Sequence, residues 1–291
     1  MRSPVSLAAR QHYPYFNPIN LYPMSNILKH QPRKRFGQNF LIDEGVVRRI
    51  VRSIRPRSDD KMVEIGPGQG AITGLILEEC ANLDVIELDR DLIPMLKVRF
   101  DRNPGFRVHE ADALKFDFSQ LTDSEKTLRV VGNLPYNIST PLIFRLIAQR
   151  HLISDMHFML QKEVVLRLAA KPGDKNYGRL SIMAQYFCEI EDLFDVPPES
   201  FNPPPKVMSS IVRLQPYTTL PITAKDETHL ETVVKLAFQQ RRKTLRNALK
   251  PLLEEIDDAA SLSVDLSLRA ERLSVADFVR LSDELSEKAD A

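Results

Sequence analysis

The sequence predicts an α/β protein with a mostly parallel sheet, helices on both sheet faces, and a small all-helical domain after it. Short apolar runs alternate with helically spaced apolar residues between about residues 62 and 148, the signature of βαβ units. Later apolar runs follow one another more directly, which predicts an antiparallel addition to the sheet. After Pro216 only helical patterns remain, so the last part of the chain is predicted to be helical.

The beginning of the chain is expected to be a disordered or non-native extension over residues 1–28. Residues 1–23 are rich in Pro, Tyr and Asn, lack periodicity and precede a second methionine, Met24. A misplaced start codon or the remnant of a targeting segment would look the same. From Asp43, a suitable N-cap, apolar residues recur at helical spacing and stop before Pro56. An amphipathic helix is therefore expected there.

The remaining elements follow from the same patterns. We expect strands at 62–65, 85–88, 106–108 and 130–131, with helices at 72–77, 92–100 and 141–148. Further strands are expected at 156–160, 187–196 and 209–214, with a helix at 162–170, and C-terminal helices at 227–240, 241–253 and 275–285. The predicted domains are residues 29–216 and residues 217–291.

Composition excludes several classes of protein. The chain is 43% hydrophobic and 27% charged, which is ordinary for a globular protein. Its two cysteines, Cys80 and Cys188, are far apart and lie outside any His/Cys cluster, so neither a disulfide framework nor a metal site is indicated. No apolar run reaches the roughly 18 residues that span a bilayer. A soluble, cytoplasmic protein without a membrane or metal partner is expected.

Positive charge is segregated along the chain, although the formal net charge is only +1. Residues 1–42 contain no Asp or Glu, and a second basic cluster follows residue 240 on a helical pattern. Either cluster could be ordinary solvated surface. Two clusters flanking one domain predict a path for a polyanion, with RNA contacts at Arg33, Lys34, Arg35, Arg241, Arg242, Lys243 and Arg246.

A glycine-rich turn and two acidic residues predict a nucleoside site. The run VEIGPGQG, residues 63–70, passes from a strand through a GxGxG turn into a helix, where backbone can approach a ligand closely. Glu87 ends the second strand and can accept both ribose hydroxyls, and Asp112 follows the third strand, where it can accept from an adenine amino group. Each feature alone is more often a turn or cap. At successive strand ends they should line one crevice.

The tetrapeptide NLPY, residues 133–136, follows the fourth strand. It could be a simple Asn-Pro turn, but beside a nucleoside crevice it suits methyl transfer to an exocyclic amine. The Asn133 side chain and a Leu134 or Pro135 carbonyl can draw the amino hydrogens out of the ring plane and favour positive charge on nitrogen. The Tyr136 ring would stack on the extruded base.

Six motifs stand at intervals along the chain: KRFGQNFL at 34–41, the Gly66 turn, NLPY at 133–136, LQKEV at 160–164, YGRLS at 177–181 and FNPPPKV at 201–207. Together they resemble the KsgA (RsmA) family of ribosomal RNA adenine dimethyltransferases over about residues 29–285. The resemblance implies a Rossmann-like class I methyltransferase domain and a small helical domain. Two residues depart from the family pattern. Met208 stands where the family usually has Asp, and Leu166 stands where an acidic or polar residue is common.

The resemblance also implies ligands and site residues. S-adenosylmethionine is the implied cofactor, bound by Asn39, Leu41, Gly66, Glu87, Asp112 and Asn133. The implied substrate is two adjacent adenines near the 3′ end of 16S rRNA, in the small ribosomal subunit or its precursor. Phe201 would stack on the target base opposite Tyr136, unless it is a core residue. A monomer is expected, and direct methyl transfer without a metal or a strong general base.

Three other functions are weighed against this one. The chain could act on large-subunit RNA, like the related Erm methyltransferases, or on adenine in DNA. The DNA enzyme would be expected to carry an acidic residue where Asn133 stands and to have a target-recognition domain. A non-catalytic assembly or transcription factor could keep the fold for binding alone. Glu87, Asp112 and Asn133 argue for retained catalysis.

Overall fold

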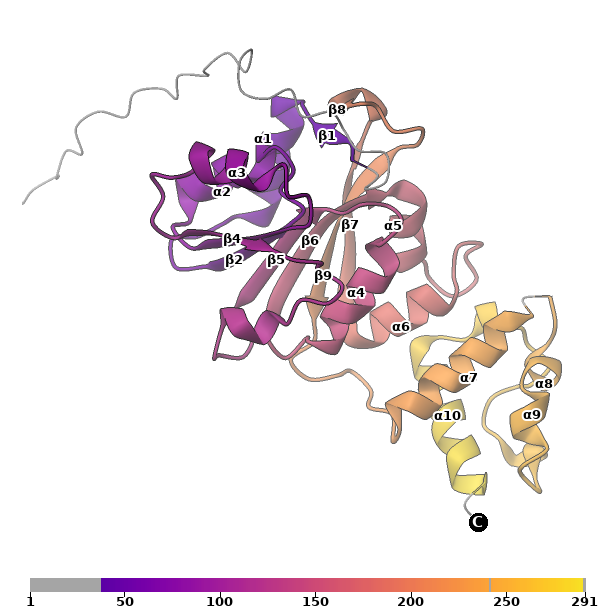
Figure 1. Ribbon diagram of the computed structural model, residues 1–291. Helices are drawn as coiled ribbons and strands as arrows, with labels where there is room; N and C mark the ends of the chain where they lie inside the picture. The colour runs from indigo at the N-terminus through magenta and orange to yellow at the C-terminus, as the bar shows by residue number, and fades with distance from the viewer. Residues whose placement is uncertain (1–37, 241, 290–291) are drawn as a thin grey trace, which may run out of the picture. The chain divides into compact units, whose positions relative to one another are not determined.

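The computed structural model describes residues 38–240 and 242–289 (Figure 1). The predicted extension over residues 1–28 lies outside this part. No helix in the described part has the length and apolar character that a bilayer-spanning segment needs. The described residues also contain no group of three or more His, Cys, Asp or Glu side chains placed to hold a metal ion.

Seven strands of the described chain form one mixed sheet in the order β4-β3-β2-β5-β6-β9-β7. The first five of these are parallel, and β9 is antiparallel to both β6 and β7. The predicted antiparallel addition is thus confirmed. The strands are β2 (Lys61–Ile65), β3 (Leu83–Glu87), β4 (Phe106–Glu110), β5 (Leu128–Asn133), β6 (Ile153–Gln161), β7 (Cys188–Val196) and β9 (Ser209–Pro216).

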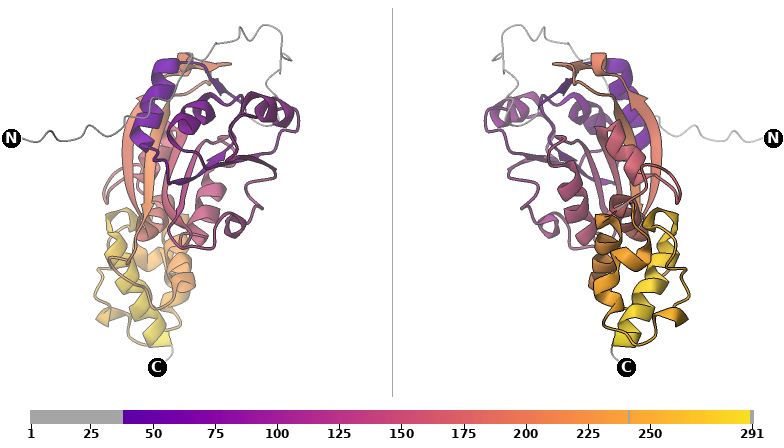
Figure 2. Two further views of the ribbon diagram at one scale, coloured as in Figure 1. Left: turned by 90° about the vertical axis from the view of Figure 1, so that its left-hand side faces the viewer. Right: turned by 90° about the vertical axis from the view of Figure 1, so that its right-hand side faces the viewer.

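Helices cover both faces of the sheet, as Figures 1 and 2 show. Helices α1 (Glu44–Ile54), α2 (Ala71–Glu79) and α3 (Ile93–Arg99) lie on one face. Helices α4 (Ser139–Ala148), α5 (Lys162–Leu168) and α6 (Arg179–Phe187) lie on the other. Successive strand residues face opposite sides, so Val63 joins the core under α4 while its neighbour Met62 joins the core under α1. Because both faces are covered, the central strands β2, β3 and β5 are mostly buried, whereas the edge strand β4 is partly exposed.

Helix α1 is fixed at both ends. At its start the Asp43 side chain accepts a hydrogen bond from the Val46 amide. At its end the Arg129 guanidinium donates to the carbonyl oxygens of Ile54, at 2.6 Å, and Arg55, at 3.1 Å. Arg129 also forms ion pairs with two aspartates, Asp60 and Asp155. The helix therefore has little freedom relative to the sheet.

The C-terminal part of the described chain is helical, as predicted. It contains α7 (Glu227–Gln239), α8 (Leu245–Ala248), α9 (Lys250–Leu253) and α10 (Val275–Ala289). Leu230 and Phe278 from this segment belong to the same apolar core as α4, α5 and α6. The buried Tyr177 hydroxyl donates to the Leu273 carbonyl at 2.9 Å. The division at residues 216 and 217 remains a prediction.

Three local predictions need correction. The single helix expected over 241–253 is wrong: a turn precedes α8, and α9 is separate from it. Pro251 explains the interruption, because it has no amide hydrogen and its ring clashes with the carbonyl four residues earlier. The sequence patterns missed α6, and Phe187 ends that helix instead of beginning a strand. They also missed the two-residue strands β1 (Phe40–Leu41) and β8 (Phe201–Asn202), which pair antiparallel.

Candidate active site

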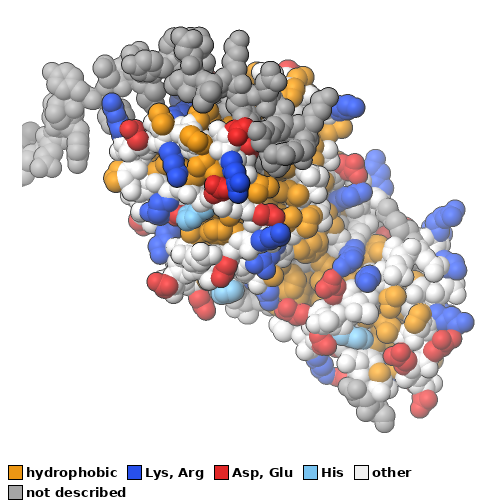
Figure 3. Space-filling model, viewed as in Figure 1, with side chains coloured by type: hydrophobic (Ala, Val, Ile, Leu, Met, Phe, Trp, Pro, Cys, Tyr) orange, Lys and Arg blue, Asp and Glu red, His pale blue; other side chains and the backbone are white. Residues whose placement is uncertain are grey.

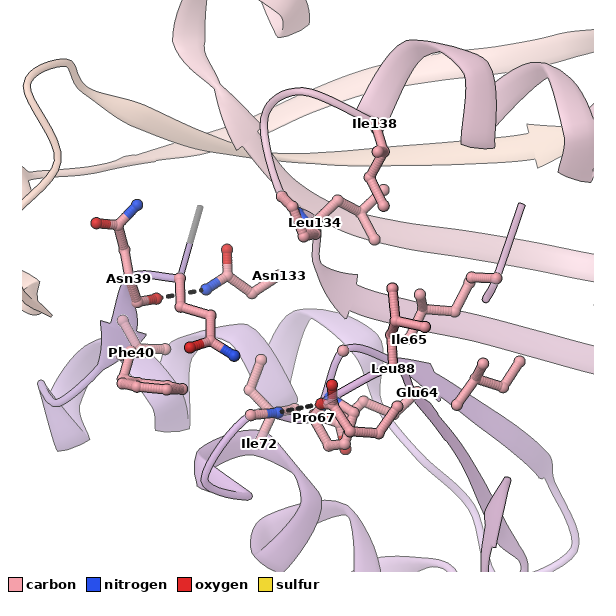
Figure 4. A pocket seen from close by; sticks show the side chains of 18 of the residues that line it. Asn39, Phe40, Glu64, Ile65, Pro67, Ile72, Leu88, Asn133, Leu134 and Ile138 are labelled. Atoms are coloured by element: carbon pink, nitrogen blue, oxygen red, sulfur yellow. Dashed lines mark hydrogen bonds between the residues drawn. The ribbon is translucent and has the colours of Figure 1, made fainter. Parts of the chain in front are cut away.

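A cavity of about 360 Å³ lies at the carboxyl ends of the parallel strands (Figure 4). That volume is typical of small-molecule sites, and the position is where open α/β sheets bind ligands. Five chain segments line it, at residues 38–41, 64–72, 86–88, 111–113 and 133–138. The lining includes all the residues predicted to bind the cofactor, Asn39, Leu41, Gly66, Glu87, Asp112 and Asn133, together with Leu134, Pro135 and Tyr136.

The glycine-rich turn between β2 and α2 forms one wall of the cavity. Gly68 and Gly70 both have positive φ, 58° and 81°, in the left-handed region that glycine adopts without steric cost. A Cβ atom on Gly70 would stand 2.8 Å from the Phe100 ring, and one on Gly68 would stand 3.1 Å from the Phe40 ring. The turn therefore needs glycine for its conformation and for its close packing.

Glu87 ends β3 with its carboxylate at the cavity. Its Oε1 accepts from the Asp89 amide at 2.8 Å, and its Oε2 accepts from the Gly68 amide at 3.4 Å. Burial raises the pKa of Glu87, and these backbone hydrogen bonds oppose the rise. The carboxylate is thus held in place by the Asp89 amide and, at a longer distance, by the Gly68 amide of the glycine-rich turn, as an acceptor for ligand hydroxyls should be.

Asp112 and Leu88 complete a surface suited to a nucleoside. The Asp112 Oδ1 accepts from the Leu114 amide at 3.0 Å, and the Oδ2 has no hydrogen bond to the described residues. Leu88 lines the cavity with 50% of its surface exposed, an apolar platform beside Glu87. S-adenosylmethionine requires acceptors for its hydroxyl and amino groups, an apolar surface for its base, and a glycine turn that its other end can approach. The residues present fit this cofactor.

Asn133 is oriented by the N-terminal segment. Its Nδ2 donates to the Asn39 backbone oxygen at 3.1 Å (Figure 4). This contact leaves the Asn133 Oδ1 without a hydrogen bond to the described residues. The Pro135 carbonyl accepts from the Ile138 amide at 3.1 Å, whereas the Leu134 carbonyl accepts no hydrogen bond from the described residues. Of the two backbone acceptors considered from sequence, Leu134 is the free one.

Tyr136 has a partner that the sequence patterns did not indicate. Its hydroxyl lies 2.8 Å from the Oγ of Ser209, a fully buried residue at the start of β9. Burial raises the pKa of Tyr136, so the phenol is neutral at physiological pH. The hydrogen bond ties the ring to the start of β9, two strands away from β5 in the sheet, and limits its rotation.

Phe201 is buried in this structure. It is 3% exposed, pairs with Leu41 across the β1–β8 ladder and belongs to the core beneath α1. It is not among the residues that line the cavity. Stacking on a target base would require its ring to leave this core, and that role remains a prediction.

Glu64 is a further residue that sequence analysis did not assign. It lines the cavity floor, is 2% exposed, and accepts from the Thr73 hydroxyl at 2.6 Å. Burial, with a smaller contribution from the nearby Glu87 charge, raises its pKa to about 7. A visible signal existed, since Glu64 is an acidic residue inside the apolar strand two positions before Gly66.

The predicted RNA-contacting residues fall into two groups. Arg33, Lys34, Arg35 and Arg241 lie outside the described residues. Arg242 and Lys243 are exposed in the turn after α7, and Arg246 is exposed on α8. Figure 3 shows Lys and Arg side chains at the outer edge of the C-terminal helical segment. The described residues of this cluster are thus accessible to RNA. Arg242 and Lys243 lie in a turn, however, and not on the helix that the sequence pattern predicted.

Comparison with known proteins gives consistent matches over the chain. A sequence model of the family described as ribosomal RNA adenine dimethylase matches residues 29–287. A relative from Saccharophagus degradans, named ribosomal RNA small subunit methyltransferase A, is 62% identical over 256 residues, covering 88% of this chain and 95% of the relative. A Pseudomonas aeruginosa relative of the same name is 59% identical over 264 residues, covering 91% of this chain and 98% of the relative.

Two crystal structures confirm the predicted fold class. A dimethyladenosine transferase from Plasmodium falciparum has a TM-score of 0.72 at 29% identity, covering 86% of this chain and 98% of the other. The 23S rRNA methyltransferase ErmE has a TM-score of 0.66 at 22% identity, covering 85% of this chain and all of the other, 100%.

Proposed function

Because the chain belongs to the ribosomal RNA adenine dimethylase family, we propose that it dimethylates the N6-amino groups of two adjacent adenines near the 3′ end of 16S rRNA. It is an S-adenosylmethionine-dependent rRNA methyltransferase. The observation that carries the proposal is the orientation of Asn133. Its Nδ2 is engaged by the Asn39 carbonyl, which leaves the Oδ1 available to a substrate amine.

S-adenosylmethionine supplies an electrophilic methyl group on a sulfonium sulfur. Glu87 and Asp112 would accept hydrogen bonds from the nucleoside part of the cofactor. The glycines of the Gly66–Gly70 turn would let the backbone of the turn approach the cofactor closely. Holding reactants in the correct geometry can supply about 7–11 kcal/mol of rate acceleration. Most of the work of this chain is therefore positioning.

The target amine is activated by hydrogen-bond acceptors. The Asn133 Oδ1 and the Leu134 carbonyl would each accept one amino hydrogen, and this draws the nitrogen lone pair out of conjugation with the ring. The same oxygens favour the positive charge that develops on nitrogen during transfer. Tyr136, held by Ser209, would stack on the extruded base. The amine attacks in its neutral form, so its proton can leave to solvent after transfer.

The RNA would contact two groups of basic residues, one before the cavity-lining residues 38–41 in the sequence and one after α7. Support comes from the exposure of Arg242, Lys243 and Arg246, and from the charge of the stretch Arg33, Lys34 and Arg35. Phosphate contacts of this kind position an RNA without reading its sequence. We further propose that the protein acts as a monomer in the cytoplasm, on the small ribosomal subunit or its precursor.

Methyl transfer from labelled S-adenosylmethionine tests the proposed function. Small ribosomal subunits lacking the modification should accept about two methyl groups on each of two adenines, and large subunits and DNA should accept none. Transfer to large subunits would support the Erm-like alternative, and transfer to DNA would support a DNA methyltransferase. Binding without transfer to any substrate would support the non-catalytic alternative.

A further inference from the structure

Helix α1 presents a concentration of arginine that the proposed function does not use. Residues 45–58 contain five arginines and no acidic residue. The apolar side of the helix, Val47, Ile50, Val51 and Ile54, is buried against the sheet. The arginines are all exposed, at positions 48, 49, 52, 55 and 57.

The arginines continue from the helix past its C-terminal end. Arg48 and Arg52 are spaced by four residues, so they lie on one side of the helix, and Arg55 is its C-cap. Arg57 follows directly beyond its end. We call Arg48, Arg52, Arg55 and Arg57 the α1 arginine face. The remaining one, Arg49, lies over the Phe194 ring, with its guanidinium carbon 3.8 Å from the ring centroid.

The α1 arginine face is not neutralised within the described chain. None of its four side chains makes an ion pair or a hydrogen bond with a described residue. Some other surface cations are paired: Arg107 pairs with Asp84, and Arg179 pairs with Glu231. Four adjacent unpaired guanidinium groups repel one another, which costs free energy unless an anion is bound between them.

Stabilisation of the helix does not account for this charge. Cations near a helix C-terminus can satisfy its last carbonyl groups. In α1 the carbonyls of Ile54 and Arg55 already accept from Arg129. Moreover, Arg55 has φ 52°, a left-handed conformation that glycine adopts at no steric cost. A smaller, neutral residue at position 55 would therefore be at least as compatible with the fold as arginine.

We propose that the α1 arginine face binds phosphates of the RNA backbone, as a contact separate from the basic cluster after α7. This inference rests on the proposed function. The guanidinium group is suited to phosphate because it donates two parallel hydrogen bonds. Arg48 and Arg52 are separated by about 6 Å along the helix axis, from a rise of about 1.5 Å per residue, and Arg55 and Arg57 extend the face beyond the end of the helix. Long side chains spread over this distance can reach several phosphates.

The beginning of α1 is close to the cavity, and its C-terminal end contacts Arg129 near the start of β5. The helix lies on the outer side of the sheet near β7 (Figure 2), where Arg49 and Phe194 meet. It begins at Glu44, shortly after residues 38–41, which line the cavity. Because the core and Arg129 hold α1 in place, its arginines need not be ordered on a mobile element when RNA binds.

The test is the salt dependence of RNA binding by the triple variant Arg48→Gln, Arg52→Gln, Arg55→Gln in the full chain. Affinity for protein-free small-subunit rRNA and for unmodified small subunits is measured over a range of KCl concentrations. Each lost phosphate contact reduces the slope of log affinity against log salt by about one. The variant should therefore show a slope shallower by about three on both probes.

A control variant removes the same number of charges elsewhere. Arg179→Gln, Lys225→Gln and Arg280→Gln together remove three cations that are already paired with Glu231, Glu287 and Asp277. This variant should keep the wild-type salt slope. Both variants should retain the wild-type melting temperature and affinity for S-adenosylmethionine, since the altered side chains do not line the cavity.

Three outcomes would overturn the inference. An unchanged salt slope in the α1 variant would remove the arginine face from the RNA site. A loss of affinity for small subunits without a loss for protein-free rRNA would mean that the face binds a ribosomal protein. If the wild-type protein itself bound no small-subunit RNA, the proposed function would fail together with the inference. That result differs from a failure of the inference alone, in which the wild type binds RNA and the variant binds it with the same salt slope.

Discussion

Replacing Asn133 with alanine should impair the chemical step far more than it impairs folding. In the structure this side chain makes one hydrogen bond, from its Nδ2 to the Asn39 carbonyl at 3.1 Å. Losing one such bond typically costs about 0.5–1.5 kcal/mol of stability. Losing a preorganised acceptor for the transition state costs about 2.7–4 kcal/mol, or about 10²–10³ in rate. The two effects therefore differ in size and can be measured separately.

The assay is single-turnover methylation of unmodified small subunits at saturating RNA and S-adenosylmethionine, with thermal unfolding measured in parallel. Asn103→Ala is the matched control, because that side chain also donates to a backbone carbonyl, of Phe100 at 3.5 Å, but lies away from the cavity. It should react at the wild-type rate. A wild-type single-turnover rate for Asn133→Ala would refute the proposed role of the tetrapeptide.

Asn133→Asp separates the two functions of the amide. An aspartate keeps an acceptor for the target amine but cannot donate to the Asn39 carbonyl, and its charge is repelled by that oxygen. We therefore expect weaker cofactor binding, because Asn39 lines the same cavity, with a smaller rate loss at saturation than in the alanine variant. An aspartate variant with normal cofactor affinity would show that the contact with Asn39 has no effect on the cavity.

Three further predictions concern neighbouring groups. Glu87→Ala should weaken S-adenosylmethionine binding by about 1.5–3 kcal/mol in calorimetry, because a charged acceptor is lost; unchanged affinity would remove Glu87 from the site. Ser209→Ala and Tyr136→Phe break the same hydrogen bond, so the double variant should lose no more activity than either single one, and additive losses would contradict the coupling. The pKa of about 7 for Glu64 lies above its unfolded value of 4.5, so its contribution to stability is present below pH 4.5 and lost as pH rises to 7. The Glu64→Gln variant should therefore be more stable than the wild type above pH 7, by up to about 3 kcal/mol. If the difference between their free energies of unfolding, measured with denaturant, stayed the same from pH 4.5 to pH 7, this prediction would be refuted.

The parallel part of the fold was predictable because its signals are local. Buried strands such as β2 and β5 are short apolar runs, and each is followed by a turn with recognisable residues. The prediction for the site rested on equally local signals: Gly66, Glu87, Asp112 and Asn133 all line one cavity, while their roles in binding stay a prediction. It required only that successive parallel strands end at the same edge of the sheet.

The missed elements lack such local signals. In α6 Ser181, Ile182, Met183 and Ala184 are consecutive and all buried, so no polar side marks a helical period. Strands β1 and β8 have two residues each, too few for any alternation. The partner of Tyr136 was equally hidden, because Ser209 is 73 positions away in the chain. Contacts of this kind depend on the packing of the whole sheet.

The short ladder between β1 and β8 has a thermodynamic consequence for the affinities of two ligands. Residues 38–41 line the cavity, and Phe40 and Leu41 also pair with Phe201 and Asn202. A ligand in the cavity and an RNA bound at the proposed basic stretch, which precedes residue 38 in the sequence, would therefore act on one segment of chain. If either ligand favours one arrangement of this segment, each must change the affinity of the other by the same factor. Cooperativity measured in one direction thus predicts its value in the other, without any further contact between the two ligands.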